Sequence, residues 1–145
     1  MFKSLLALVV LSLSATAVAS DWKTIDTGTV GVVSADSTAS LELTTIVSEK
    51  NDHGLAFYFY PADQPTHCEF AVDVYKEFAV NGQTVAFKKF CMEGSKNTAY
   101  TPADYTNASK LVGQLTRNDL RYVNIEGQQF STVGFAEQVE KLLAD

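Results

Sequence analysis

The chain has 145 residues, 17 acidic and 11 basic side chains, a formal net charge of −6 at pH 7 and two cysteines. An acidic chain is a poor match for nucleic acid or for an anionic membrane surface, because both attract basic proteins. The acidity suits a basic protein partner, and it equally suits solubility alone.

Residues 1–20 have the pattern of a cleavable secretory signal peptide. Lys3 supplies a basic start, an apolar run follows from Leu5 to Leu13, and small residues surround Ala19. The apolar run is about half the ~20 residues that span a bilayer, so no membrane span is expected after cleavage. Cleavage after Ala19 or Ser20 predicts an exported protein, periplasmic or secreted, and loss of Lys3 moves the net charge from −6 to about −7. The remaining residues, 21–145, have the size of a single domain.

The two cysteines, Cys68 and Cys91, predict one disulfide, because an even pair in an oxidising compartment is usually bonded. The predicted strand register places Cys91 opposite Val72, and the distance from there to Cys68 is too long for a bridge in a straight strand. A bulge or bend between Cys68 and Tyr75 is therefore expected, the alternative being that Cys68 lies on a segment that folds back over the sheet.

Alternating apolar residues predict strands over 29–33, 41–48 and 55–60. Pro61 ends the third strand, which is expected to pair antiparallel with the second. The clearest local signal is Asn81-Gly82, which predicts a two-residue type I′ hairpin between residues 75–80 and 83–88. In this register Phe78 lies opposite Val85, and the core face of the hairpin carries Phe78, Val80, Val85 and Phe87, with Lys76 and Lys89 at its edge.

The second half of the chain is predicted less sharply. Turn-forming residues indicate an irregular segment from Glu93 to Ser109, followed by short strands over 111–116 and 121–126. A C-terminal helix is expected, capped by Ser131 or Thr132 and with Phe135, Val139, Leu142 and Leu143 on one face. The predicted class is mainly β, a small antiparallel β-sandwich or barrel with one C-terminal α-helix and one disulfide.

No motif for catalysis, metal binding or cofactor binding is found. His53 and His67 lack zinc-site spacing, and Gly-x-Ser-x-Gly and glycine-rich phosphate loops are absent. The acidic residues on strands fall at outward positions and are read as solvated; they are Glu42, Glu69, Asp73, Glu77 and Glu126. Asn107-Ala108-Ser109 is a glycosylation sequon, which has meaning only in a eukaryotic secretory pathway.

The candidate recognition residues lie in a polar segment and on a strand face that are expected at the surface. The 93–109 segment holds Tyr100, Asp104 and Tyr105 among small polar residues, a mixture that recognition loops use. Asp104 offers a carboxylate to a cationic cleft, and the tyrosines offer aromatic anchors. The alternative is an ordinary loop with its tyrosines on the core. Tyr58 and Tyr60 lie opposite Phe57 and Phe59 on their strand and form the next candidate surface.

These patterns favour a non-enzymatic exported binding protein with a protein partner, for which a basic protein is one candidate, and no cofactor. In general build the chain is similar to periplasmic inhibitor or immunity proteins that block cell-wall-degrading enzymes. The Ser-Gly-x-x-Tyr loop of the known periplasmic lysozyme inhibitors is absent, since Gly94-Ser95 and Tyr100 do not match its spacing. One alternative is a carrier of apolar small molecules with a cavity lined by Leu55, Phe57, Phe59, Phe78 and Phe87. The other is an enzyme without a recognisable motif.

Overall fold

The computed structural model describes residues 21–47, 53–63, 74–91 and 98–144. Within them, nine strands form one antiparallel sheet in the order β1-β2-β3-β4-β7-β6-β5-β8-β9. The strands are β1 (Lys23–Asp26), β2 (Thr29–Val33), β3 (Ser40–Val47), β4 (His53–Tyr60), β5 (Tyr75–Val80), β6 (Gln83–Cys91), β7 (Thr98–Pro102), β8 (Tyr122–Ile125) and β9 (Gln128–Ser131). The helices are α1 (Tyr105–Leu115) and α2 (Phe135–Ala144). The mainly β prediction is confirmed, with one curled sheet in place of two facing sheets.

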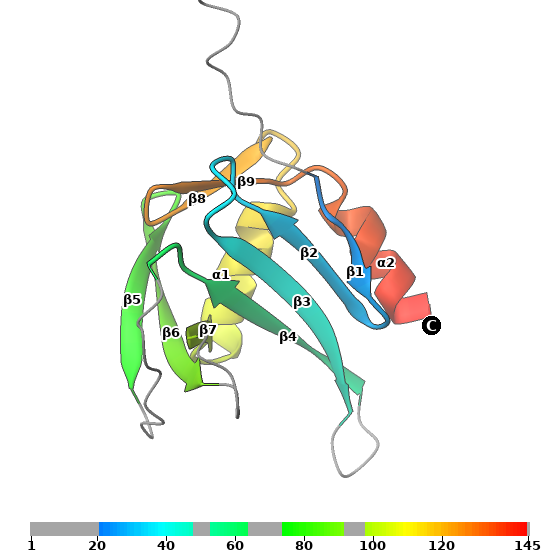
Figure 1. Cartoon of the computed structure of the whole chain (residues 1–145), viewed down its shortest axis with the longest axis horizontal. Helices are drawn as coiled ribbons and strands as arrows, with labels where there is room; N and C mark the ends of the chain where they lie inside the picture. Colours follow the sequence, from blue (N-terminus) through cyan, green and yellow to red (C-terminus); the bar gives the residue numbers. More distant parts are fainter. Residues whose placement is uncertain (1–20, 48–52, 64–73, 92–97, 145) are drawn as a thin grey trace, which may run out of the picture.

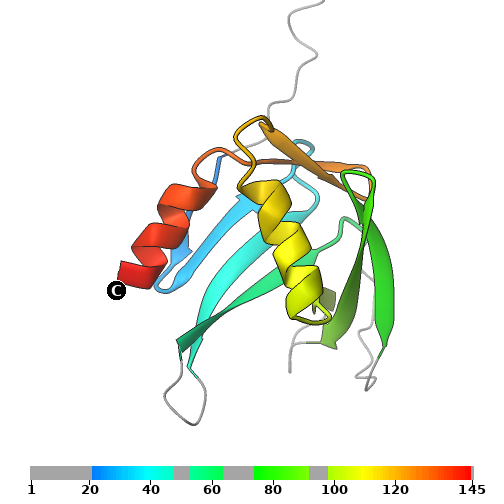
Figure 2. The ribbon, with the colours of Figure 1, turned by 180° about the vertical axis from the view of Figure 1, so that it is seen from behind.

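The sheet curls so strongly that its two ends come together. The backbone N–H of Ala35, in the turn after β2, donates to the carbonyl oxygen of Gln129 in β9 at 3.0 Å. Figure 1 shows the outer face of β3 and β4, and Figure 2 shows α1 and α2 on the opposite, concave side. The outer face of β3 and β4 is therefore not covered by a helix.

The two hairpins predicted from the sequence are present. β3 pairs with β4 over their whole length, with Leu41 opposite Phe59. In the β5–β6 hairpin Phe78 lies opposite Val85, as predicted. Asn81 and Gly82 have φ of 49° and 78°, the left-handed conformation that a type I′ turn requires.

The core lies between the concave face of the sheet and the helices. Phe59 contacts Phe78 edge-on with ring centroids 5.3 Å apart, and Phe78 contacts Phe87 in the same way at 5.3 Å. These rings are almost completely buried. The side chains predicted to line a carrier cavity, Phe57, Phe59, Phe78 and Phe87, are thus part of the packed core, while Leu55 is partly exposed.

The segments predicted as an irregular loop and as a strand over 111–116 were assigned wrongly. Residues 98–102 form β7, and residues 105–115 form α1. Asp104 is the N-cap, and Leu111 and Leu115, four residues apart, are buried on one face of the helix. Thr, Asn, Ser and Gly are frequent in α1 and have low helix propensity, so tertiary packing of the leucines decides the structure.

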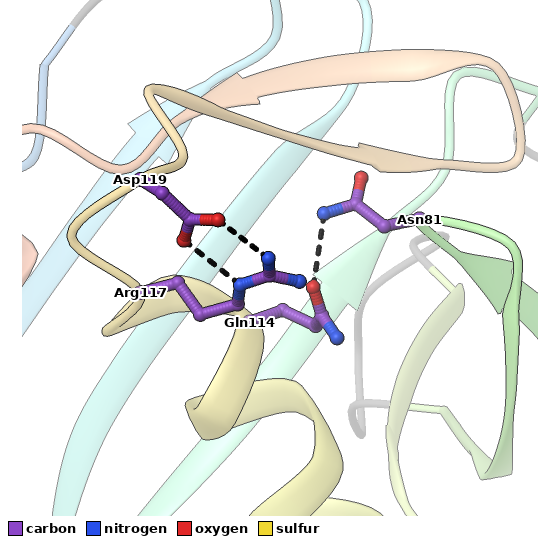
Figure 3. Close-up of polar contacts among 4 residues, drawn as sticks. All are labelled: Asn81, Gln114, Arg117 and Asp119. Atoms are coloured by element: carbon purple, nitrogen blue, oxygen red, sulfur yellow. Dashed lines mark hydrogen bonds and ion pairs between the residues drawn. The ribbon is translucent and has the colours of Figure 1, made fainter.

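α1 covers a sheet edge that would otherwise be unpaired. β7 pairs with β6 only from Phe87 to Cys91, which leaves the first half of β6 without a neighbouring strand on that side. Asn107 Oδ1 accepts the backbone N–H of Ala86 at 2.8 Å, and Lys110 Nζ donates to the carbonyl oxygen of Thr84 at 3.4 Å. Gln114 of α1 also accepts a hydrogen bond from the Asn81 side chain in the β5–β6 turn (Figure 3). Side chains on one helix face thus replace the missing strand.

α2 and Trp22 close the other end of the domain. Trp22 is buried, its Nε1 donates to the carbonyl oxygen of Ser131 at 2.8 Å, and its ring lies 4.9 Å from that of Phe135. The C-terminal helix was predicted correctly but begins at Phe135, after Gly134 in the left-handed region, and Leu143 is largely exposed. The predicted caps were wrong because Ser131 belongs to β9 and the hydroxyl of Thr132 donates to the Leu120 carbonyl oxygen.

Several predictions fall outside the described residues. They include the signal peptide over 1–20, His67, Cys68 and the bend that follows it. Cys91, at the end of β6, is not a free thiol, and its pairing with Cys68 stays a prediction. No helix in the described ranges is long and apolar enough to cross a bilayer.

Candidate recognition surface

Tyr100 is oriented toward the core. It lies in β7, half-buried, with its ring edge-on to that of Phe78 at 5.0 Å, and burial raises the pKa of its hydroxyl. Lys76 Nζ lies 5.1 Å from the Phe78 ring centroid and 5.9 Å from that of Tyr100. The environment of Tyr100 matches the alternative in which the predicted loop's tyrosines pack on the core.

Asp104 and Tyr105 have different environments. The Asp104 carboxylate caps α1 by accepting hydrogen bonds from the backbone N–H and the side-chain amide of Asn107, at 2.9 and 2.8 Å. These hydrogen bonds lower the pKa of Asp104. Tyr105 is the first residue of α1 and is 87% exposed. Of the three residues predicted in this segment, Tyr105 alone presents its ring fully to solvent.

Tyr58 and Tyr60 lie on the outer face of the sheet, as their alternation with Phe57 and Phe59 predicts. Glu42 of β3 pairs directly with Tyr58, so its side chain shares that face. Phe90 of β6 faces the same way, is 40% exposed and lies 5.8 Å from the Tyr58 ring. We call Glu42, Tyr58, Tyr60 and Phe90 the tyrosine face.

Strand order explains how Phe90 reaches Tyr58. β7 lies between β4 and β6, and its residue opposite Phe90 is Ala99. Because the alanine side chain is small, the two rings can approach each other across β7. The tyrosine face therefore combines residues from three strands, and only the pairing of β3 with β4 is local in sequence.

The carboxylate of Glu42 is the unusual group on this face. Burial raises the pKa of Glu42, and a hydrogen bond from the Tyr60 hydroxyl opposes this effect in part. Burial, and then the negative charge of Glu42, raise the pKa of Tyr60 to about 12. Tyr60 therefore remains protonated at neutral pH and donates to the carboxylate. No cation of the described chain pairs with Glu42, so its negative charge is uncompensated within that part of the chain.

A second surface feature is an open groove of about 420 Å³ between the C-terminal end of α1 and the N-terminal end of α2. Arg117 and Glu137 are among its lining residues. Asp119 holds the Arg117 guanidinium through two hydrogen bonds of 3.0 and 2.6 Å (Figure 3), and Lys141 pairs with Glu137 at 3.8 Å. Two charges of the groove are thus already paired within the chain.

Catalytic and metal-binding constellations do not emerge from the described residues. Within them there is no group of three His, Cys, Asp or Glu side chains that could hold a metal ion. Every buried side-chain polar atom of these residues has a hydrogen-bond partner. Comparison with protein-family models, with curated proteins and with solved structures finds no match to this chain.

Glu42 and Phe90 were not identified as site residues from the sequence. Alternation along its strand predicts a solvated Glu42, although pairing the two predicted strands of the first hairpin places it beside Tyr58 or its neighbour. Phe90 lies beyond the predicted end of its strand, and its approach to Tyr58 depends on the non-local order β4-β7-β6. No sequence pattern indicates that order.

Proposed function

We propose that this chain is a non-enzymatic exported binding protein that recognises a protein partner through the tyrosine face. The observation that carries the proposal is the cluster of Tyr58, Tyr60 and Phe90 around a partly buried Glu42 carboxylate that has no cationic partner among the described residues, on a sheet face that neither helix covers. Tyrosine and phenylalanine are enriched at protein interfaces. Removing a charged group from water costs stability, so a partly buried carboxylate without a cationic partner is a candidate for function.

The partner that fits this face is basic. An arginine or lysine side chain of the partner would meet the Glu42 carboxylate and could stack on the ring of Tyr58, which combines a salt bridge with a cation–π contact. The net charge of −6 acts in the same direction at long range and would speed encounter with a cationic protein. In a bacterial source, a periplasmic inhibitor or immunity protein against a basic cell-wall-degrading enzyme has this chemistry.

The test is affinity capture from an envelope extract, with the purified protein immobilised and with three variants in parallel. Tyr58→Ala and Glu42→Gln change the tyrosine face, whereas Tyr105→Ala removes an exposed aromatic ring elsewhere and serves as the matched control. We expect a basic protein to be retained by wild type and by Tyr105→Ala, and to be lost or released at lower salt with the other two.

Loss of a hot-spot tyrosine typically weakens a complex by about 2 kcal/mol or more, roughly thirtyfold. Circular dichroism of each variant establishes that the fold is retained. A partner that binds all four proteins equally would place recognition outside the tyrosine face, and a partner lost only with Tyr105→Ala would favour the start of α1.

A further inference from the structure

The second feature that points to a partner is the outer edge of β5. In a strand, the N–H and C=O groups of successive residues point alternately to the two sides. The carbonyl oxygen of Val74 accepts from Lys89 of β6 at 2.9 Å, so residue 74 directs its backbone groups toward β6. Tyr75, Glu77 and Ala79 therefore direct theirs away from β6.

Only the last of these three positions is used within the described chain. The N–H of Ala79 donates to Glu126 Oε1 at 2.8 Å, and its carbonyl oxygen accepts from the N–H of Glu126 at 3.2 Å. β8 pairs with β5 only where Val80 lies opposite Ile125, at the end of the strand. The outward N–H and C=O groups of Tyr75 and Glu77 have no partner in the described ranges, and β5 stands at the margin of the molecule (Figure 1).

Three other edges of the described sheet are protected in ways that β5 is not. α1 covers the first half of β6, and the turn after β2 bonds to β9 through Ala35 and Gln129. β1 has four residues and an irregular register between Thr24 and Asp26, which interrupts an edge. At β5 the edge is regular, and Tyr75 is 58% exposed.

We propose that the β5 edge is a strand-addition site that accepts an extended segment of a partner protein, antiparallel to residues 75–77. This inference goes beyond the proposed function, because it uses backbone groups of β5 rather than the side chains of the tyrosine face. Strand addition obtains affinity from main-chain hydrogen bonds and specificity from alternate side chains. Tyr75 and Glu77 supply two donors and two acceptors for it.

The charges on the strand decide against a second copy of this chain as the occupant. The two-fold antiparallel register that would use all four free groups is centred on Lys76, with Tyr75 opposite Glu77. It places Lys76 directly opposite Lys76 of the other copy, in the close pair where like charges destabilise. A partner segment with a basic residue opposite Glu77, an acidic residue opposite Lys76 and an apolar residue opposite Tyr75 has no such conflict.

The probe that tests the site is a capped hexapeptide, Thr-Val-Arg-Glu-Val-Thr, which presents that order of charges in an antiparallel strand. Its control is Thr-Val-Glu-Arg-Val-Thr, with the two charges exchanged. Residue-resolved amide hydrogen exchange of the purified protein is measured by NMR with and without each peptide. We expect the first peptide to slow exchange at Tyr75 and Glu77 severalfold, with no change at Lys76 and Phe78, whose amides point toward β6.

Glu77→Lys removes the expected preference and tests the pairing directly. Cross-strand charge pairs change affinity by about two- to fivefold, so wild type should bind the first peptide better than the exchanged one by that factor. In the variant, Lys76 and the new lysine give each peptide one favourable and one unfavourable charge pair, so the two peptides should bind about equally. Glu77 has no side-chain partner in the described chain, so thermal unfolding of the variant should match wild type.

Two results would overturn the inference. One is unchanged exchange at Tyr75 and Glu77 with both peptides at millimolar concentration. The other is strong protection of these two amides in the protein alone. Protection that grows with protein concentration would identify a second copy as the occupant, and protection independent of concentration would mean that the chain covers its own edge. Neither result bears on the tyrosine face, which capture with Tyr58→Ala tests separately.

Discussion

Replacing Glu42 by glutamine should make the protein more stable at neutral pH and leave its stability in acid unchanged. Burial raises the pKa of this carboxyl above its ordinary value of 4.5. A raised pKa means that the folded state holds the proton more tightly than the unfolded state. The contribution of Glu42 to stability is therefore fully present below pH 4.5 and is lost as the pH rises through the folded pKa. Glutamine keeps the shape and an acceptor for Tyr60 but does not ionise.

The magnitude follows from the partial exposure of the side chain. One pKa unit corresponds to about 1.4 kcal/mol, but solvent screens a group that is only half-buried, so we expect a gain of roughly 0.5 kcal/mol at pH 7.5. For a domain of this size that is about 2 °C in Tm. The variant would trade this gain for weaker partner binding, which is the behaviour of a residue kept for function.

Thermal or urea unfolding at pH 4 and pH 7.5 provides the measurement, with Glu77→Gln as the matched control. Glu77 is an exposed carboxylate on β5, so its replacement should change stability little at either pH. If Glu42→Gln destabilised the protein equally at both pH values, the Glu42–Tyr60 hydrogen bond would be a structural element, and the argument for an energetically costly carboxylate would fail.

Three further outcomes are expected. The difference between the titrations of wild type and Tyr60→Phe at 295 nm should show a tyrosine that ionises near pH 12. Because the pKa of Tyr60 is raised in the folded state, its contribution to stability should persist up to about pH 10 and be lost between pH 10 and 12. Asn107→Ala should destabilise the protein by about 1–3 kcal/mol in urea unfolding, because it leaves a backbone N–H of the β6 edge unpaired. Lys110→Ala is the control: it removes a long and exposed contact and should change stability by less than about 0.5 kcal/mol. Intact mass should rise by two hydrogens on reduction if Cys68 and Cys91 are bonded, and an unchanged mass would exclude the disulfide.

The parts of the fold that the sequence predicts are those with local signals. Asn81-Gly82 determines a turn, and the alternation on either side then determines every pair of the β5–β6 hairpin. The same holds for the face of β4 on which Tyr58 and Tyr60 lie. Because side chains alternate between the two faces of a strand, one buried position such as Phe59 determines the face of every other residue in that strand.

α1 was missed because its local and tertiary signals disagree. Pro102 and Asp104 are residues typical of turns, although an Asp three residues before Asn107 is also a helix N-cap signal. The spacing of Leu111 and Leu115 fits a helix, but a six-residue window that ends in Thr116 fits a strand as well. The choice between helix and strand depends on the first half of β6, which has no neighbouring strand on one side. That gap is recognised only when the order of the strands is known.

The tyrosine face and the β5 edge suggest how one partner could meet this protein. Tyr75 belongs to the β5 edge, and its side chain shares the outer face with Lys88 of β6, two positions before Phe90 along that strand. The outer sheet face thus carries aromatic side chains on β4, β5 and β6, from Tyr58 to Tyr75. A partner that added a strand beside β5 would place its outward side chains on this same face, where a neighbouring loop could reach Glu42. If both proposals hold for one partner, the costs of Tyr58→Ala and Glu77→Lys to binding should add when the two changes are combined, because the two contacts lie on different strands and share no residue.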